Sequence, residues 1–182
     1  VINGLKDSFE GKTPLMKPEE IQAVQKEFAA KMQAKQEAKL KEMQEANAKA
    51  GAAFLEENKK KEGVKVTESG LQYEVLKEGD GPQPKATDQV KVDYVGTLVD
   101  GTEFDSSVKR GQPAVFGVNQ VIPGWTEALQ LMKTGAKYRI VIPSDLAYGA
   151  NGAPPVIEPN SVLVFEVDLI SIETPAAEKK AE

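Results

Sequence analysis

The sequence predicts an α+β protein, in which a long N-terminal α-helix precedes an antiparallel β-sheet wrapped around one short α-helix. Residues 18–62 are rich in the helix formers Ala, Lys, Glu and Gln. Gly51 is a poor helix former among them, but a single glycine does not break the helix. From Val64 to Ile172 the chain changes to short segments of alternating apolar and polar residues, separated by Gly and Pro. One short helical stripe follows Pro123 within this region. Because one helix can cover only one face of a sheet, we expect the sheet to wrap around that helix.

Residues 1–17 have the pattern of the interior of a helical module. Their apolar residues fall on one helical face, and Gly11 is a suitable stop. We therefore expect a processed or truncated chain. The members of this apolar face are Val1, Ile2, Leu5 and Phe9.

A long connecting helix is predicted over residues 18–63. Pro18 suits its first position, and two glutamates follow where the helix dipole favours acids. About 45 residues correspond to roughly 65 Å. The helix is either a solvated linker or a spacer whose first apolar stripe belongs to a self-association module. The first stripe comprises Ile21, Val24, Phe28 and Met32, and a second comprises Leu40, Met43, Ala50, Phe54 and Leu55.

The strands are predicted from alternation of apolar and polar residues. Asp100-Gly101 predicts a two-residue hairpin with a type I′ turn, because that turn needs positive φ at both positions. The most apolar strand, residues 162–170, is expected at the centre of the sheet. Residues 173–182 are expected to form a disordered tail. The remaining strands are predicted at residues 71–75, 90–94, 114–116 and 138–142.

The short helix presents Trp125, the only tryptophan, from its first turn. Pro123 suits the first helical position, and Leu129 and Met132 continue the apolar stripe. Gly135 is a suitable left-handed cap for its end. On composition alone Trp125 is more simply explained as a core residue.

Composition excludes several classes of function. The 182-residue chain has neither cysteine nor histidine, which removes disulfides, thiolate nucleophiles, Ser-His and Cys-His catalysis and the commonest metal ligand. A net charge of −5 argues against nucleic-acid binding. The chain has no apolar run of the ~18–20 residues that a membrane span needs, and its start has no signal-peptide pattern. We expect no metal, no cofactor, no nucleic-acid partner and no membrane span.

An aromatic pocket with few charges is predicted where helix, strands and the long loop of residues 148–159 meet, and such a cavity suits an apolar ligand. Asp105 and the Tyr148 hydroxyl are its polar candidates. A reaction in this pocket must need no strong acid or base, and rotation about Xaa-Pro bonds, with its barrier of ~18–20 kcal/mol, is such a reaction. The other predicted pocket residues are Tyr94, Phe104, Phe116, Val121, Ile122, Trp125, Ile157 and Phe165.

Several ordered sequence blocks resemble those of FKBP-type peptidyl-prolyl cis-trans isomerases. They are Tyr94–Leu98 with Asp100–Ser107, then Val121–Trp125, Leu146–Gly149 and Leu163–Phe165. The resemblance covers about residues 64–172 and identifies them as the isomerase domain. The long arm and residues 51–58 resemble the bacterial macrophage-infectivity-potentiator (Mip) subgroup, whose members are envelope homodimers joined through an N-terminal helical module. Residues 1–17 would then be the remnant of that dimerisation module, lacking its first helix.

The resemblance implies roles for the pocket residues. Trp125 would form the floor that receives the proline ring, and the other aromatic and aliphatic residues would line it. The Ile122 N–H and the Tyr148 hydroxyl would donate to ligand carbonyls, and Asp105 would influence turnover. The macrolides tacrolimus and rapamycin would inhibit. The location implied is the periplasm or outer-membrane-associated envelope of a Gram-negative bacterium.

Two residues depart from the human-type domains of this family. Ala114 replaces an aromatic residue and leaves a more open wall, and Ala153 stands where histidine is frequent. The leading interpretation is an isomerase for folding polypeptides, with chaperone activity beside it. The alternatives are a holdase chaperone whose pocket is inactive, and a structural helical spacer with an inert domain.

Overall fold

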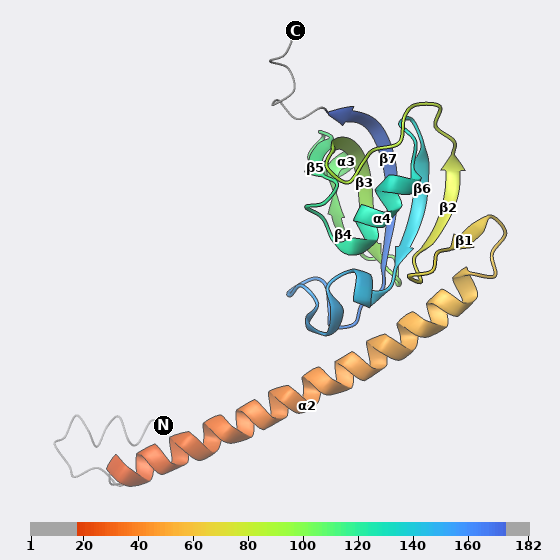
Figure 1. Ribbon diagram of the computed structural model, residues 1–182. Coiled ribbons are helices and arrows are strands. Elements are labelled where there is room, and N and C mark those ends of the chain that lie inside the picture. The colour runs from red at the N-terminus through yellow and green to blue at the C-terminus, as the bar shows by residue number, and fades with distance from the viewer. Residues whose placement is uncertain (1–17, 174–182) are drawn as a thin grey trace. The chain divides into compact units, whose positions relative to one another are not determined.

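A computed structural model describes residues 18–173 of the chain (Figure 1). The chain divides into two compact units, Val1–Glu42 and Met43–Glu182. The prediction of a helical face from Val1 to Phe9 lies outside the described residues, as does that of a tail over residues 173–182 except at Glu173, which is the last residue of a strand.

The long N-terminal helix is confirmed: α2 runs from Pro18 to Asn58 and contains 41 residues. It ends before the predicted stop at Gly63, because the buried Asn58 amide donates to Gln72 Oε1 at 2.9 Å and a series of tight turns follows. Within the first unit its predicted apolar stripe faces solvent, and Phe28 is 64% exposed.

The second unit contains one antiparallel sheet with the order β1-β2-β6-β7-β3-β4, and β5 pairs with β3 outside this path. β7 pairs with β6 on one side and β3 on the other, which confirms the prediction that it is central. The strands are β1 (Val64–Val66), β2 (Gln72–Lys77), β3 (Gln89–Leu98), β4 (Glu103–Ser106), β5 (Ala114–Gly117), β6 (Lys137–Ile142) and β7 (Leu163–Glu173).

The short helix α4 (Pro123–Leu131) lies in the curve of this sheet, as Figure 1 shows. Gly124 permits this close approach, because a Cβ at that position would collide with the Ile142 side chain of β6. The buried face of α4 includes Trp125, Ala128 and Leu129. The prediction of a wrapped α+β fold is thereby confirmed.

The end of α4 differs from the prediction. The helix stops at Leu131, and Met132 is already extended. Gly135 has the predicted left-handed conformation, with φ of 87°, but it belongs to the turn that leads into β6. Its N–H donates to the Leu169 carbonyl at 2.7 Å, which ties that turn to β7.

The outer face of the sheet is also covered in part, which the sequence analysis did not anticipate. Val141, Val162 and Val164 form a second buried apolar cluster, against which Phe54 and Leu55 of α2 pack. This explains why Val164 is buried although the core-facing residues of β7 alternate with it. The last turns of α2 therefore belong to the same compact unit as the sheet.

The predicted hairpin at Asp100-Gly101 is present, but its turn is not type I′. Gly101 has φ of 87°, whereas Asp100 is not at positive φ. The Gly101 N–H donates to the Leu98 carbonyl at 3.0 Å, so a β-turn over Val99 and Asp100 precedes a left-handed glycine. The sequence analysis also missed the short elements α3 (Ser107–Arg110), η1 (Ser144–Leu146) and η2 (Gly149–Asn151).

Candidate active site

A cavity of about 290 Å³ opens where α4, the sheet and the segment around Tyr148 meet. Every pocket residue predicted from the sequence lines it, except Ile157. Gln120 also lines it and was not predicted. The lining residues are Tyr94, Phe104, Asp105, Phe116, Gln120, Val121, Ile122, Trp125, Tyr148 and Phe165.

Ile157 lies in the core instead, with 6% of its surface exposed. Its N–H and carbonyl exchange hydrogen bonds of 3.0 and 2.8 Å with Ala153. This bridge is part of the loop between β6 and β7, and Ile157 is not among the residues that line the cavity. The loop sequence has no apolar periodicity, so it could not indicate whether Ile157 lies in the core or lines the pocket.

Trp125 is both a core residue and the floor of the pocket. Only 4% of its surface is exposed, yet it lines the cavity. Its ring meets those of Tyr94 and Phe165 nearly edge-on, with centroid separations of 5.2 Å in both cases, and that of Phe116 at 5.8 Å. Such edge-to-face contacts are favourable and directional. They hold the indole in one orientation at the base of the cavity.

Gly96 of β3 makes room for two of these rings. A Cβ at this position would lie 2.7 Å from Phe165 Cε1 and 2.8 Å from Phe104 Cζ. Phe104 and Phe165 themselves pack edge-on with centroids 5.4 Å apart. Glycine is therefore needed here for space, because the two aromatic walls occupy the volume that a side chain would fill.

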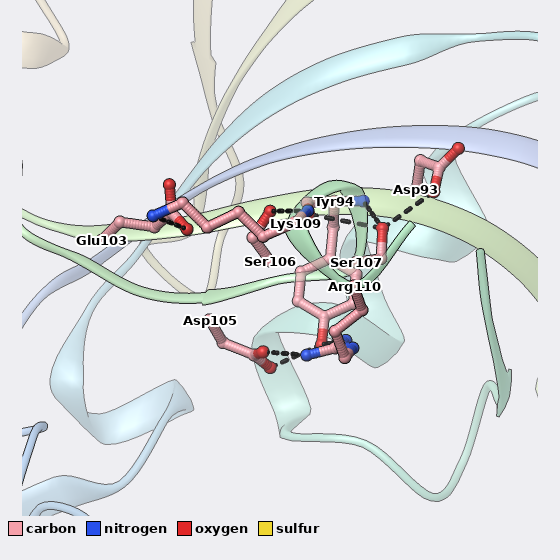
Figure 2. A network of polar contacts seen from close by, with 8 residues as sticks. All are labelled: Asp93, Tyr94, Glu103, Asp105, Ser106, Ser107, Lys109 and Arg110. Atoms are coloured by element: carbon pink, nitrogen blue, oxygen red, sulfur yellow. Dashed lines mark hydrogen bonds and ion pairs between the residues drawn. The ribbon is translucent and has the colours of Figure 1, made fainter. Parts of the chain in front are cut away.

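The polar side of the pocket is a three-residue network, which Figure 2 shows. The Tyr94 hydroxyl donates to Asp105 Oδ2 at 2.5 Å, and Arg110 Nη2 donates to the Tyr94 oxygen at 2.7 Å. Arg110 also forms an ion pair with Asp105 Oδ1. The guanidinium carbon lies 5.4 Å from the centroid of the Tyr94 ring. Asp105 is thus held by two donors in a fixed orientation.

Sequence reasoning missed Arg110, which comes from the short helix α3. Ser106 caps this helix by accepting from the Lys109 N–H at 3.2 Å. The fully buried Ser107 fastens α3 to β3, because its hydroxyl donates to Asp93 Oδ1 at 2.8 Å and accepts from the Tyr94 N–H at 2.9 Å (Figure 2). A serine cap followed by a basic last turn was the available signal.

The network keeps Asp105 ionised. Burial acts to raise the pKa of Asp105, but hydrogen bonds from Tyr94 and Arg110 and the charge of Arg110 outweigh it and lower the pKa from its ordinary 3.8. Burial and the hydrogen bond to Asp105 raise the pKa of Tyr94, so its hydroxyl stays protonated at neutral pH. Because the Asp105 pKa is lowered by folding, its stabilising contribution is present above pH 3.8 and is lost as the pH falls through the lowered value.

Two lining residues of the cavity carry a donor without a partner among residues 18–173. Ile122 precedes α4, and its carbonyl accepts from the Trp125 and Thr126 N–H groups while its own N–H makes none of the described hydrogen bonds. The Tyr148 hydroxyl likewise has no described partner, and the residue is 42% exposed. Both groups are available to a bound carbonyl oxygen.

Comparison with known proteins identifies the family. A family profile described as FKBP-type peptidyl-prolyl cis-trans isomerase matches residues 81–170, and one described as the domain amino terminal to such isomerases matches residues 1–75. The chain is 44% identical to the outer membrane protein MIP of Legionella longbeachae, over 97% of this chain and 76% of that protein. The chain belongs to the FKBP-type peptidyl-prolyl cis-trans isomerase family. The predicted resemblance is confirmed.

Other relatives of this FKBP-type chain share the name FkpA. It is 54% identical to FKBP-type peptidyl-prolyl cis-trans isomerase FkpA of Aeromonas hydrophila, over 98% of this chain but 66% of that protein's length. The crystal structure of FkpA from Escherichia coli matches with a TM-score of 0.83 at 42% identity, covering 95% of this chain and 80% of that one. Among the described residues, no helix has the length and apolarity required to cross a membrane.

Proposed function

We propose that this FKBP-type chain accelerates cis-trans rotation about Xaa-Pro bonds in folding polypeptides. The observation that carries the proposal is the aromatic cavity floored by Trp125, with an ionised Asp105 on one side and two unpartnered donors at its rim. A proline ring fits such an apolar floor, and the flanking carbonyls would reach the donors. Family membership supports the same activity.

The proposed mechanism follows from the electronic structure of the amide. The planar ground state is more charge-separated than the twisted transition state, so transfer from water to an apolar pocket disfavours the ground state more. The Ile122 N–H and the Tyr148 hydroxyl would donate to substrate carbonyls. They would thereby hold the part of the substrate on one side of the Xaa-Pro bond still while the part on the other side rotates. Each ~1.4 kcal/mol removed from the barrier gives a tenfold gain in rate. No acid–base step is needed, which suits a chain without histidine or cysteine.

Asp105 would act as the polar wall of this site. Its carboxylate is held by Tyr94 and Arg110 rather than by solvent alone, so its negative charge has a fixed place beside the rotating amide. Fixed charges in a partly desolvated site act on developing charge without reorganisation. Phe104, Phe116, Val121 and Phe165 would supply the apolar contact with the proline ring.

We expect Asp105→Leu and Tyr148→Phe to slow isomerisation without unfolding the protein. Loss of the fixed charge should lower kcat/KM about tenfold or more, and loss of one hydroxyl donor roughly two- to tenfold. The measurement is cis-to-trans conversion of a short Ala-Leu-Pro-Phe peptide. Asp105→Asn removes the charge but keeps the size of the side chain, so it separates the effect of the charge on kcat/KM from the effect of side-chain size.

The control for this assay is Glu103→Gln on the same strand. Glu103 pairs with Lys109 at 2.9 Å and does not line the pocket, so its change should leave kcat/KM unaltered. If the unaltered chain gives no acceleration but still suppresses aggregation of an unfolded client, the enzyme proposal fails. The holdase alternative would then take its place.

Self-association is a second proposal and rests on the first unit alone. Ile21, Val24, Phe28 and Met32 lie three or four residues apart on α2 and are all more than a third exposed. An uncovered apolar stripe of this kind is typical of an interaction surface. We propose that it forms part of a homodimer interface made by the N-terminal helices.

We expect Val24→Glu with Phe28→Glu to shift the chain toward monomer in sedimentation velocity, because two charges would be buried at the interface. Gln33→Glu, a polar-face substitution on the same helix, should leave the sedimentation coefficient unchanged. A monomeric unaltered chain at all accessible concentrations would contradict the dimer.

We further propose an envelope location, chaperone activity toward the same polypeptides, and inhibition by tacrolimus and rapamycin. The location is supported by the name of the Legionella relative, an outer membrane protein. Inhibition is supported by the apolar cavity and its free donors, which suit a large apolar ligand with several carbonyls. Fractionation of the cell and binding titrations test these proposals separately.

A further inference from the structure

The loop of residues 149–160 closes on itself between η1 and β7. The Asn160 N–H donates to the Gly149 carbonyl at 2.9 Å, and this hydrogen bond joins the two ends of the loop. Farther along, Ala153 and Ile157 pair through two backbone hydrogen bonds. The loop starts directly after Tyr148, so its placement decides where that hydroxyl stands at the pocket rim.

Helix α2 supplies hydrogen bonds to both arms of this loop. Gln44 Nε2 donates to the Ala150 carbonyl at 2.7 Å, and the Gln44 carbonyl accepts from Asn160 Nδ2 at 3.1 Å. One turn later, Asn47 Nδ2 donates to the Pro159 carbonyl at 2.9 Å. Ala150 lies within η2, the turn that Tyr148 itself begins.

A third residue on the same face of α2 brings the helix close to the sheet. Gly51 is four residues beyond Asn47, and a Cβ on it would lie 2.7 Å from Val162 Cγ2. Asn47 also donates to Glu158 Oε2 at 3.0 Å. Positions 44, 47 and 51 are spaced so that they share one helical face. This face of the helix therefore contacts both the loop and Val162, the residue directly before β7.

We propose that Gln44 and Asn47 are positioning residues of the isomerase site, which act by holding the 149–160 loop so that the Tyr148 hydroxyl faces the pocket. The inference rests on the proposed isomerase function. Pro159 is buried, so its carbonyl must move to find water if it loses the Asn47 donor. The exposed Ala150 carbonyl would lose the hydrogen bond that ties η2 to α2. The nearest pocket group to feel that movement is Tyr148, because it directly precedes η2. The last turns of α2 are then part of the site's framework as well as a connector.

The test is the double variant Gln44→Ala, Asn47→Ala in the full chain, assayed with the Ala-Leu-Pro-Phe peptide. We expect kcat/KM to fall about three- to tenfold, because small misplacement of a positioning group lowers the rate strongly. Amide hydrogen exchange should become faster at Gly152 and Asn160. The matched control is Gln33→Ala, whose amide on the same helix donates to Glu37 at 3.0 Å.

The same double variant in a Tyr148→Phe background separates a positioning role from a general structural one. If the hydrogen bonds of Gln44 and Asn47 to the loop act through the Tyr148 hydroxyl, removing them should lower kcat/KM little further once that hydroxyl is absent. The two effects would then be non-additive. Unchanged kcat/KM in the double variant, or an equal further fall in the Tyr148→Phe background, would overturn the inference. Absence of activity in the unaltered chain would instead refute the proposed function.

Discussion

Trp125→Leu is expected to lower kcat/KM toward the proline peptide by about 100-fold, the largest effect on the reaction of any single replacement. The indole forms the pocket floor and is held edge-on by Tyr94, Phe116 and Phe165. Leucine would fill less of that floor and leave the three rings without their common partner. A loss of two to three kcal/mol of transition-state contact corresponds to about this factor. The kcat/KM of Trp125→Phe, which retains an aromatic face, should lie between that of Trp125→Leu and that of the unaltered chain.

The same residue is also core, so the assay needs a core control. Leu129 lies four residues along α4, is 1% exposed and does not line the pocket. Leu129→Ala should destabilise the fold by about 2–5 kcal/mol while leaving kcat/KM of the folded fraction within a few-fold of the unaltered chain. Denaturant unfolding measures the first quantity and the peptide assay the second. Equal losses of activity in both variants would mean that Trp125 serves only the core.

Much of the fold could be predicted because local patterns dictated it. Alternation placed β3 and β6, and the apolar run that begins at Val162 identified the central strand. β7 is buried on both faces from Leu163 to Phe165 and alternates in burial beyond them. Pro123 marked the start of α4 through its fixed φ and missing N–H. These signals are short in range, and each depends on residues adjacent in the chain.

The interactions that could not be predicted join distant segments. Nothing local indicates that Phe54 and Leu55 cover the outer face of the sheet, or that Gln44 reaches Ala150 across the intervening chain. The type I′ turn was wrong because Asp-Gly also suits a turn in which only the glycine takes positive φ. Arg110 was missed because its partner, Asp105, lies in the preceding strand, and a four-residue helix has too little periodicity to predict.

In the site, most of the lining residues could be named in advance, but Ile157 and Gln120 could not be assigned correctly from the sequence. Residue type and resemblance selected Trp125, Tyr94 and Phe165, and the structure brings them together. Ile157 has the same apolar character and a suitable loop, yet it packs in the core and is not among the lining residues. Gln120 was overlooked because one amide among loop residues has no pattern to distinguish it. Such differences are decided by tertiary packing, not by composition.

Gly96→Ala is expected to weaken tacrolimus binding and to lower kcat/KM by about tenfold or more. The added methyl would lie within 3 Å of ring atoms in both Phe104 and Phe165, which pack against each other and both line the pocket. β3 cannot retreat, because β4 and β7 pair with it on either side of Gly96. The rings must therefore move into the cavity, and overpacking of this kind also costs about 1–3 kcal/mol of stability.

Binding can be followed through the fluorescence of Trp125, the sole tryptophan and the floor of the same pocket. Val95→Ala is the matched control, since Val95 is the preceding residue of β3, points to the other face and does not line the cavity. Adding Phe104→Leu to Gly96→Ala should recover part of the lost affinity, because two of the three closest atoms belong to the Phe104 ring. If Gly96→Ala binds tacrolimus as the unaltered chain does, the two rings have room to yield and the wall is not rigid. If Val95→Ala is equally impaired, the effect arises from β3 as a whole rather than from the contact between Gly96 and the rings.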